Sequence, residues 1–271
     1  MGANEGLAGF RAVDHTRDPD FFVRFMEAGH RPPAIRTIKA RMLERIALVR
    51  GEAVLDVGCG PGIDLLEMAE VVGVAGRLVG LDTSATMIAE AGRRAAARRA
   101  PAAFVVGDGQ ALPFPAGAFD VCRTERMLMH VADAGRALGE MVRVTRPGGR
   151  VAAFDFDHET MMVDSPDKET TRTIAQTFAD SLRHGWIGRQ LPRLFRERGL
   201  VGVSVDTLTA FIDYPFAELL LGGHCTKLQT DGVVTPGAMR RWWENLRAAD
   251  ERGVFLLGFT AFVVVGAVAV P

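Results

Sequence analysis

Residues 54–62 read Val-Leu-Asp-Val-Gly-Cys-Gly-Pro-Gly, and this stretch decides the fold. Its apolar first half predicts a short buried strand over 53–57, and residues 63–72 have the apolar spacing of an amphipathic helix. The glycines between them allow a tight turn and the close approach of a ligand, and the N–H groups at a helix start favour an anion. A strand, a glycine loop and a helix in this order predict a nucleotide- or nucleoside-binding unit.

The glycine spacing separates this loop from two other phosphate-binding loops. The dinucleotide fingerprint G-x-G-x-x-G needs glycine at position 63, where Ile63 stands, which argues against a nicotinamide dehydrogenase. A P-loop needs Gly-Lys-Ser/Thr, and the sequence after Gly62 does not contain it. The pattern G-x-G-x-G therefore does not specifically predict a pyrophosphate-binding site.

Strands and helices alternate downstream of the loop. Because alternating strands and helices form parallel sheets with helices on both faces, we expect a doubly wound α/β domain. The predicted strands cover 53–57, 78–81, 104–106, 121–123, 151–156 and 201–211, and the predicted helices cover 63–72, 84–97, 134–144, 191–198, 214–221 and 236–252.

The two ends of the chain follow other patterns. Residues 1–20 read as an irregular tail, and 21–50 as two helices separated by Pro32 and Pro33. The run from Val254 to Val270 has no charged residue but is shorter than the ~20 residues of a membrane helix, so a buried hairpin or pair of strands is the better interpretation. Residues 157–190 are polar, and a largely helical insertion is expected there.

Acidic residues follow the second and third predicted strands. Asp82 ends the second strand, where a carboxylate can accept both hydroxyls of a ribose. Asp108 follows the third strand, at the carboxyl edge where open α/β sheets bind ligands. A helix N-cap is the alternative role for both residues.

Five successive motifs resemble those of class I S-adenosylmethionine-dependent methyltransferases, in particular the ubiquinone- and menaquinone-biosynthesis and small-molecule enzymes. They are VLDVGCGPG (54–62), GLDTSATMI (80–88), GDGQALPF (107–114), FDVCRTERMLMHVAD (119–133) and MVRVTRPGGR (141–150). The resemblance implies a Rossmann-like sheet of seven strands, mostly parallel with the last antiparallel. It also implies a helical cap over residues 1–50 and a methyltransferase domain over 51–271, with lid segments near 157–190 and 213–238.

The same resemblance implies S-adenosyl-L-methionine as cofactor and S-adenosyl-L-homocysteine as product. Gly58 and Gly60 would contact the methionine part, with Asp56 supporting the loop. Cys59, in the same loop, is a further residue of the cofactor site, and its side chain is expected to pack. Asp82 would hold the ribose, with Thr83 and Met87 beside the adenosine. Asp108 would bind the adenine amine. The remaining implied cofactor residues are Gly107, Gly109 and Gln110 near the adenine and Thr124 and Glu125 near the amino-acid end.

Histidines are the candidate general bases. The cofactor supplies the reactivity in an in-line methyl transfer, while the protein supplies alignment and, for some acceptors, a base. The four candidates are His130, His158, His184 and His224. Each has a structural alternative as a packed or surface residue.

Composition excludes several classes of function. The 271 residues have a formal net charge of -1, which does not suit a protein that neutralises a nucleic-acid backbone. The cysteines Cys59, Cys122 and Cys225 form no metal-binding spacing, so no metal site is expected and a reducing cytoplasm fits. We therefore expect a small-molecule acceptor as partner, with no nucleic acid and no membrane. Homodimer and monomer both stay open.

The leading hypothesis is methyl transfer to an O, N or C atom of a small, apolar or amphipathic metabolite, with natural-product biosynthesis as its context. Quinone-ring C-methylation is the alternative within the same class. A protein that binds S-adenosylmethionine without transferring methyl, as a pericyclase-like or regulatory scaffold, is the alternative from another class.

Overall fold

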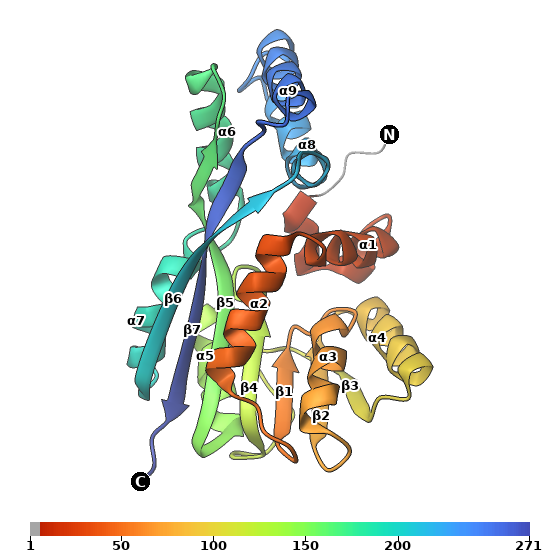
Figure 1. Cartoon of the computed structure of the whole chain (residues 1–271), viewed down its shortest axis with the longest axis vertical. Coiled ribbons are helices and arrows are strands. Elements are labelled where there is room, and N and C mark those ends of the chain that lie inside the picture. Colours follow the sequence, from red (N-terminus) through yellow and green to blue (C-terminus); the bar gives the residue numbers. More distant parts are fainter. Residues whose placement is uncertain (1–5) are drawn as a thin grey trace.

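The computed structural model describes residues 6–271, which form a seven-stranded sheet in the order β3-β2-β1-β4-β5-β7-β6 with helices on both faces (Figure 1). Neighbouring strands from β3 to β5 are parallel, and β7 is antiparallel to both β5 and β6. The strands are β1 (Ala53–Val57), β2 (Arg77–Asp82), β3 (Ala102–Val106), β4 (Phe119–Glu125), β5 (Thr145–Val163), β6 (Leu200–Ile212) and β7 (Leu257–Val268). This architecture confirms the predicted Rossmann-like class.

The helices begin where the sequence provides capping residues. Asp18, Ser84 and Asp133 each accept a hydrogen bond from a backbone N–H in the first turn of the helix that follows. Pro33 opens α2, as expected of a residue with a preset φ. The helices are α1 (Pro19–His30), α2 (Pro33–Ile46), α3 (Ile63–Val72), α4 (Ala85–Arg98), α5 (Ala134–Val144), α6 (Lys168–Ser181), α7 (Ile187–Glu197), α8 (Tyr214–Thr230) and α9 (Pro236–Glu251).

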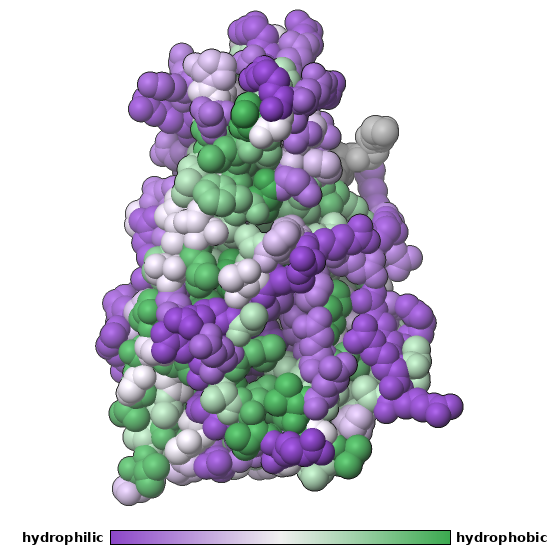
Figure 2. All heavy atoms as spheres, viewed as in Figure 1, coloured by the Kyte–Doolittle hydropathy of each residue, from purple (hydrophilic) through white to green (hydrophobic). Residues whose placement is uncertain are grey.

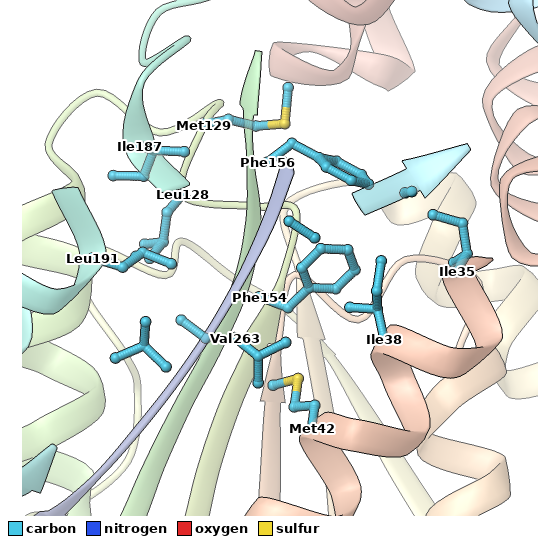
Figure 3. Close-up of a cluster of buried hydrophobic side chains, with 14 of the residues drawn as sticks. Ile35, Ile38, Met42, Leu128, Met129, Phe154, Phe156, Ile187, Leu191 and Val263 are labelled. Atoms are coloured by element: carbon cyan, nitrogen blue, oxygen red, sulfur yellow. The ribbon is translucent and has the colours of Figure 1, made fainter. Parts of the chain in front are cut away.

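The core lies on both faces of β5 and β7 (Figure 3). On one face, Ile38 and Met42 of α2 pack against Phe154. On the other, Ile187 and Leu191 of α7 approach Leu128. All of these side chains are buried, so α2 and α7 hold the second half of the sheet between them.

Three expectations need correction. The apolar run at 254–270 forms the single strand β7 rather than a hairpin, and its composition follows from pairing between β5 and β6 with helices on both faces. Residues 157–163 continue β5 instead of entering a helical insertion, because they pair with β7. The tail expected over 1–20 is ordered in its described part, with two 3₁₀ turns, η1 (Gly6–Arg11) and η2 (Val13–His15), before α1. Residues 1–5 lie outside the described part.

A group of helices covers the carboxyl edge of the sheet. α6, α8 and α9 gather around the extended ends of β5 and β7 (Figure 1). Trp242 Nε1 of α9 donates to Thr171 Oγ1 of α6 at 2.9 Å, which ties two of these helices together. The face in Figure 2 is dominated by hydrophilic residues, with apolar residues in smaller groups between them. Over residues 6–271, the longest apolar stretch of any helix falls short of what a bilayer crossing requires.

Candidate active site

A cavity of about 360 Å³ opens at the carboxyl edge of β1, β2, β4 and β5. Its volume is within the usual range for small-ligand sites. One half is formed by the glycine loop and the acids after β2 and β3, and the other by apolar side chains from α1, α2, β5, β6, α8 and β7. The two halves belong to one continuous space.

The glycine loop has a backbone that only glycine adopts easily. Gly58, Gly60 and Gly62 have φ of 75°, 51° and 74°. A Cβ on Gly58 would lie 2.5 Å from Cγ of Met127, so no side chain fits between the loop and the wall of the cavity. Gly58 N–H donates to the carbonyl oxygen of Leu81 at 2.7 Å, which fixes the loop against β2.

Asp82 connects this loop to the next strand. Its two carboxylate oxygens accept hydrogen bonds of 2.9 Å from the backbone N–H groups of Gly60 and Ser84. Burial raises the pKa of Asp82 above its usual value, and the two N–H donors oppose that effect. The carboxylate is therefore placed at the centre of the loop, between the β1 and β2 turns.

Asp108 occupies the corresponding position after β3. Its Oδ1 accepts the backbone N–H of Gln110 at 2.8 Å, and Gln110 Oε1 in turn accepts the N–H of Asp133 at 2.8 Å. The cavity wall on this side also includes Thr83, Met87, Gly107 and Gly109. Most of the residues that the sequence assigns to a cofactor thus lie around one half of the cavity.

Three of those residues lie behind the wall instead. Thr124 is fully buried, and its Oγ1 donates to the carbonyl oxygen of Val57 at 2.7 Å, which joins the ends of β4 and β1. Cys59 packs against β2, where a Cβ on Gly80 would meet its Sγ at 2.7 Å. Burial raises the pKa of Asp56 to about 7, although the charge of Arg123 opposes the rise. Asp56, Cys59 and Thr124 support the loop without lining the cavity.

A buried ion cluster underlies the loop and reaches the cavity through Glu125. The Glu125 carboxylate lies 3.1 Å from Lys39 Nζ, 2.9 Å from Arg123 Nη2 and 2.7 Å from Arg126 Nη2. Although burial acts to raise it, these three cations hold the pKa of Glu125 well below its usual value. Lys39 also lies 2.8 Å from Asp64, so α2 is linked to α3 through the cluster.

The apolar half is rich in phenylalanine. Its walls include Phe10, Phe25, Phe156, Phe216 and Phe259, together with Ile35, Ile212 and Leu220. The aromatic side chains meet mostly edge to face or tilted, the arrangement that aromatic quadrupoles favour. Such walls suit an apolar or aromatic ligand.

Two of the four candidate histidines line this half. His130 stacks on Phe10 with ring centroids 5.4 Å apart, and His158 lies 5.6 Å from the ring of Phe259. Burial lowers the pKa of each to about 3, so both imidazoles are neutral at physiological pH. Among residues 6–271, Nδ1 of each ring has no hydrogen-bond partner. The site therefore contains two neutral proton acceptors in an apolar setting.

The other two histidines lie outside the cavity. His184 Nε2 is 3.1 Å from the carbonyl oxygen of Val131. His224 Nε2 is 3.0 Å from Thr177 Oγ1, and its ring packs edge-on against Phe178. Both positions are consistent with structural roles.

The site also contains residues that sequence reasoning missed. The 3₁₀ turns provide Leu7, Phe10, Arg11 and Val13, and the turn before α7 provides Arg183. Asp14 holds the N-terminal segment in place, because its carboxylate accepts from Ser84 Oγ at 2.7 Å and from Ala85 N–H at 2.6 Å. No local pattern in the first 20 residues indicates this contact with α4. Within the described part of the chain, no group of three or more His, Cys, Asp or Glu side chains has the arrangement of a metal site.

Known proteins similar to this chain agree with the geometry. A family model described as a methyltransferase domain matches residues 54–149. A protein of Streptomyces fradiae named "Uncharacterized 37.1 kDa protein in transposon TN4556" is 39% identical over 240 residues, which is 86% of this chain and 67% of that protein. The demethylmenaquinone methyltransferase of Lactococcus lactis is 31% identical over 183 residues, 61% of this chain and 72% of the enzyme.

The fold has a counterpart among solved structures that contains a cofactor. The phosphoethanolamine N-methyltransferase 2 of Haemonchus contortus, solved in complex with S-adenosyl-L-methionine, superimposes with a TM-score of 0.62 and 17% identity. The match covers 96% of this chain and 60% of that one.

Proposed function

Because the chain belongs to the class I S-adenosylmethionine-dependent methyltransferases, we propose that it methylates an O, N or C atom of a small, largely apolar acceptor. The observation that carries this proposal is the single cavity that joins the glycine loop and its acids to a phenylalanine-lined chamber. An in-line transfer needs donor and acceptor in one enclosed space, and this cavity provides it.

The residues of the first half fit S-adenosylmethionine. A Cβ on Gly58 would collide with Met127, so the loop needs a bare backbone at this point, and the part-buried carboxylate of Asp82 stands beside it. When bound, the cofactor supplies an electrophilic methyl group on a sulfonium. We assign the methionine part to Gly58, Gly60 and Glu125, and the ribose to Asp82.

The adenosine end is assigned to the residues after β2 and β3. Asp108 would accept a hydrogen bond from the adenine amine. The further contacts with the adenosine would come from Thr83, Met87, Gly107, Gly109 and Gln110. Asp56, Cys59 and Thr124 would act from behind, by holding the loop and the strand ends in position.

The acceptor half of the cavity excludes water and contains side chains that can accept a proton. Phenylalanine walls favour an apolar body, and His130 and His158 are neutral because of their burial. A pKa of about 3 makes each imidazole a weak base, so it can accept a proton only from an acceptor oxygen that becomes strongly acidic as it bonds to the methyl group, whereas an imidazolium could accept none. We therefore propose these two histidines, and neither His184 nor His224, as candidate bases.

Quinone-ring C-methylation is the second candidate. The aromatic walls of the cavity would suit a planar ring, and the Lactococcus lactis relative is a demethylmenaquinone methyltransferase. A ring carbon activated by a neighbouring hydroxyl would use the same histidines as proton acceptors. Natural-product acceptors with an apolar body remain the leading class.

The test is calorimetric titration of the folded protein with S-adenosylmethionine and S-adenosylhomocysteine, followed by an acceptor screen. Binding of both, with the demethylated product formed only when an acceptor is present, supports the proposal. If the folded protein binds neither compound, the proposed function is wrong. Mass spectrometry of the methylated acceptor then separates a quinone ring from other classes.

A further inference from the structure

Two arginines at the acceptor side of the cavity have no acidic partner among residues 6–271. Arg11 comes from η1 and Arg183 from the turn between α6 and α7, and both line the cavity. Among residues 6–271, no carboxylate lies within 4 Å of either guanidinium. Arg126, the third arginine of the wall, is instead paired with Glu125 at 2.7 Å. Within the described part of the chain, the charges of Arg11 and Arg183 are therefore not balanced by a carboxylate, whereas that of Arg126 is.

The guanidinium groups of Arg11 and Arg183 both contact backbone carbonyl groups on the same side of the cavity. Arg11 Nη2 donates to the carbonyl oxygen of Ser181 at 3.2 Å, two residues before Arg183. Arg183 Nη1 lies 3.4 Å from the carbonyl oxygen of His130. Burial and the charge of Arg183 lower the pKa of Arg11, and both arginines add to the lowering of the His130 pKa after burial itself and His158. The two charges thus act on each other and on one wall.

Their place along the sheet edge separates them from Asp82 and Asp108, and the third acid of the wall, Glu125, is already paired with other cations. Asp82 and Asp108 follow β2 and β3, at one end of the strand order, whereas His130 follows β4 and Arg183 contacts its loop. The backbone N–H of His184 is 3.3 Å from the carbonyl oxygen of Met129, so the Arg183 turn lies directly on this loop. Two like charges that act on each other at the rim of an apolar chamber are stabilised when an anion joins them.

We propose that Arg11 and Arg183 form the binding site for an oxyanion on the acceptor, a carboxylate or a phosphate. This inference rests on the proposed function and narrows its acceptor to amphiphilic anions. The apolar body of the acceptor would enter among the phenylalanines, and the anionic group would stay at the exposed rim. A planar guanidinium can donate two parallel hydrogen bonds to the oxygens of one carboxylate or phosphate group. A neutral amide or hydroxyl on the acceptor cannot accept both bonds in this way.

The test uses the protein saturated with S-adenosylhomocysteine and two matched pairs of aromatic probes. These are naphthoate against naphthamide, and naphthyl phosphate against naphthol. We expect at least one anion to bind about tenfold more tightly than its neutral partner, the effect of one or two charged hydrogen bonds. The pair with the larger ratio identifies the oxyanion. Equal affinities within both pairs, or no binding of either anion, overturn the proposal.

Variants test whether Arg11 and Arg183 cause the preference for the anionic probe. The double variant Arg11→Gln/Arg183→Gln should bring the anion-to-neutral ratio close to one. Arg196→Gln is the matched control, because Arg196 is also exposed and donates to a carbonyl oxygen, that of Pro192, but lies outside the cavity. It should keep the wild-type ratio. A double variant that keeps the wild-type ratio overturns the proposal.

A second measurement separates the acceptor from the cofactor. If the arginines held the carboxylate of the cofactor, the double variant would lose affinity for S-adenosylhomocysteine but not for methylthioadenosine, which lacks the amino acid. We expect both affinities to change less than twofold, and a selective tenfold loss would overturn the assignment. Failure of the wild-type protein to bind S-adenosylhomocysteine would instead sink the proposed function itself.

Discussion

The Asp82 carboxylate, at the end of β2, accepts the backbone N–H of Gly60 at 2.9 Å and so ties the glycine loop to the neighbouring strand. Its removal should affect both the loop and the proposed ribose contact. We expect Asp82→Ala to weaken binding of S-adenosylhomocysteine by about 10- to 100-fold, since a hydrogen bond to a charged group contributes about 1.5–3 kcal/mol. Isothermal titration calorimetry measures the change.

Asp167→Ala provides a control for that experiment. Asp167 also accepts a backbone N–H, that of Thr170 at 3.0 Å, but it caps α6 away from the cavity. The variant should lose stability, about 0.5–2 kcal/mol, and keep its affinity. Equal losses of affinity in the two variants would mean that the Asp82 effect is general destabilisation.

The loop glycine Gly58 should not tolerate a methyl group. Its φ is 75°, and an added Cβ would lie 2.5 Å from Met127 Cγ. We expect Gly58→Ala to lower the free energy of unfolding by about 1–3 kcal/mol and to weaken cofactor binding. Gly92→Ala should instead raise it by roughly 0.5–1 kcal/mol, because Gly92 lies in α4 with open space around it. Urea unfolding that ranks the two variants in the opposite order would contradict the described loop.

The buried cluster around Glu125 should be sensitive to loss of its central carboxylate. Glu125→Ala leaves Lys39, Arg123 and Arg126 without their shared partner, and breaking a buried pair in this way costs about 3–5 kcal/mol. Glu197→Ala removes an exposed pair with Arg193 and should cost less than about 1 kcal/mol. Urea unfolding of both variants tests the contrast, and similar losses would show that the cluster is solvated.

The buried carboxyl of Asp155 should make stability depend on pH. Burial raises its pKa from 3.8 to about 8, so the folded state keeps a proton that the unfolded state releases. The stabilisation is fully present below pH 3.8 and is lost as the pH rises toward 8, by up to about 1.4 kcal/mol per pH unit. Asp155→Asn should therefore gain stability relative to wild type as the pH increases from 5 to 8. A difference that stays constant over this range would contradict the shift.

The proposed role of His158 predicts an effect on the rate and none on cofactor binding. His158→Phe keeps a flat ring among Phe156 and Phe259 but removes the proton acceptor. For a hydroxyl acceptor we expect kcat to fall by about 10²–10⁴-fold at unchanged affinity for S-adenosylhomocysteine. His224→Phe, outside the cavity, should retain the wild-type rate.

The pH profile gives a second check on His158. Burial lowers its pKa to about 3, so the wild-type rate should not decline between pH 8 and pH 5 through protonation of this ring. A decline with an apparent pKa near 6.5 in wild type that is absent from His158→Phe would show that the imidazole is solvated in the working enzyme.

The first half of the sheet could be predicted because its signals are local. The glycine loop after β1, the caps Ser84 and Asp133, and the proline pair at the start of α2 each act on the next few residues of the chain. The order of motifs then identified the family. Local signals of this kind are sufficient to place Gly58, Asp82 and Asp108 around one cavity.

The rest depends on contacts between distant segments. The insertion of β7 between β5 and β6 is a matter of strand pairing, which the apolar pattern of 257–268 does not specify. Asp14 binds the start of α4, and Arg11 donates to the carbonyl oxygen of Ser181, although nothing near either residue in the sequence indicates a partner. The acceptor half of the cavity is built from such contacts, so the sequence predicts only His130 and His158 among its walls and not the surrounding phenylalanines and arginines.

The position of β7 has a consequence for how the chain folds during its synthesis on the ribosome. β7 pairs with β5 on one edge and with β6 on the other. Neither β5 nor β6 can therefore complete its hydrogen bonds until residues 257–268 emerge from the ribosome. Translation proceeds at about 5–20 residues per second, so the open edge of β5 waits several seconds for its partner. Unpaired edges are templates for aggregation. Newly made chains should therefore depend on chaperones most strongly in the interval between synthesis of β6 and release of β7.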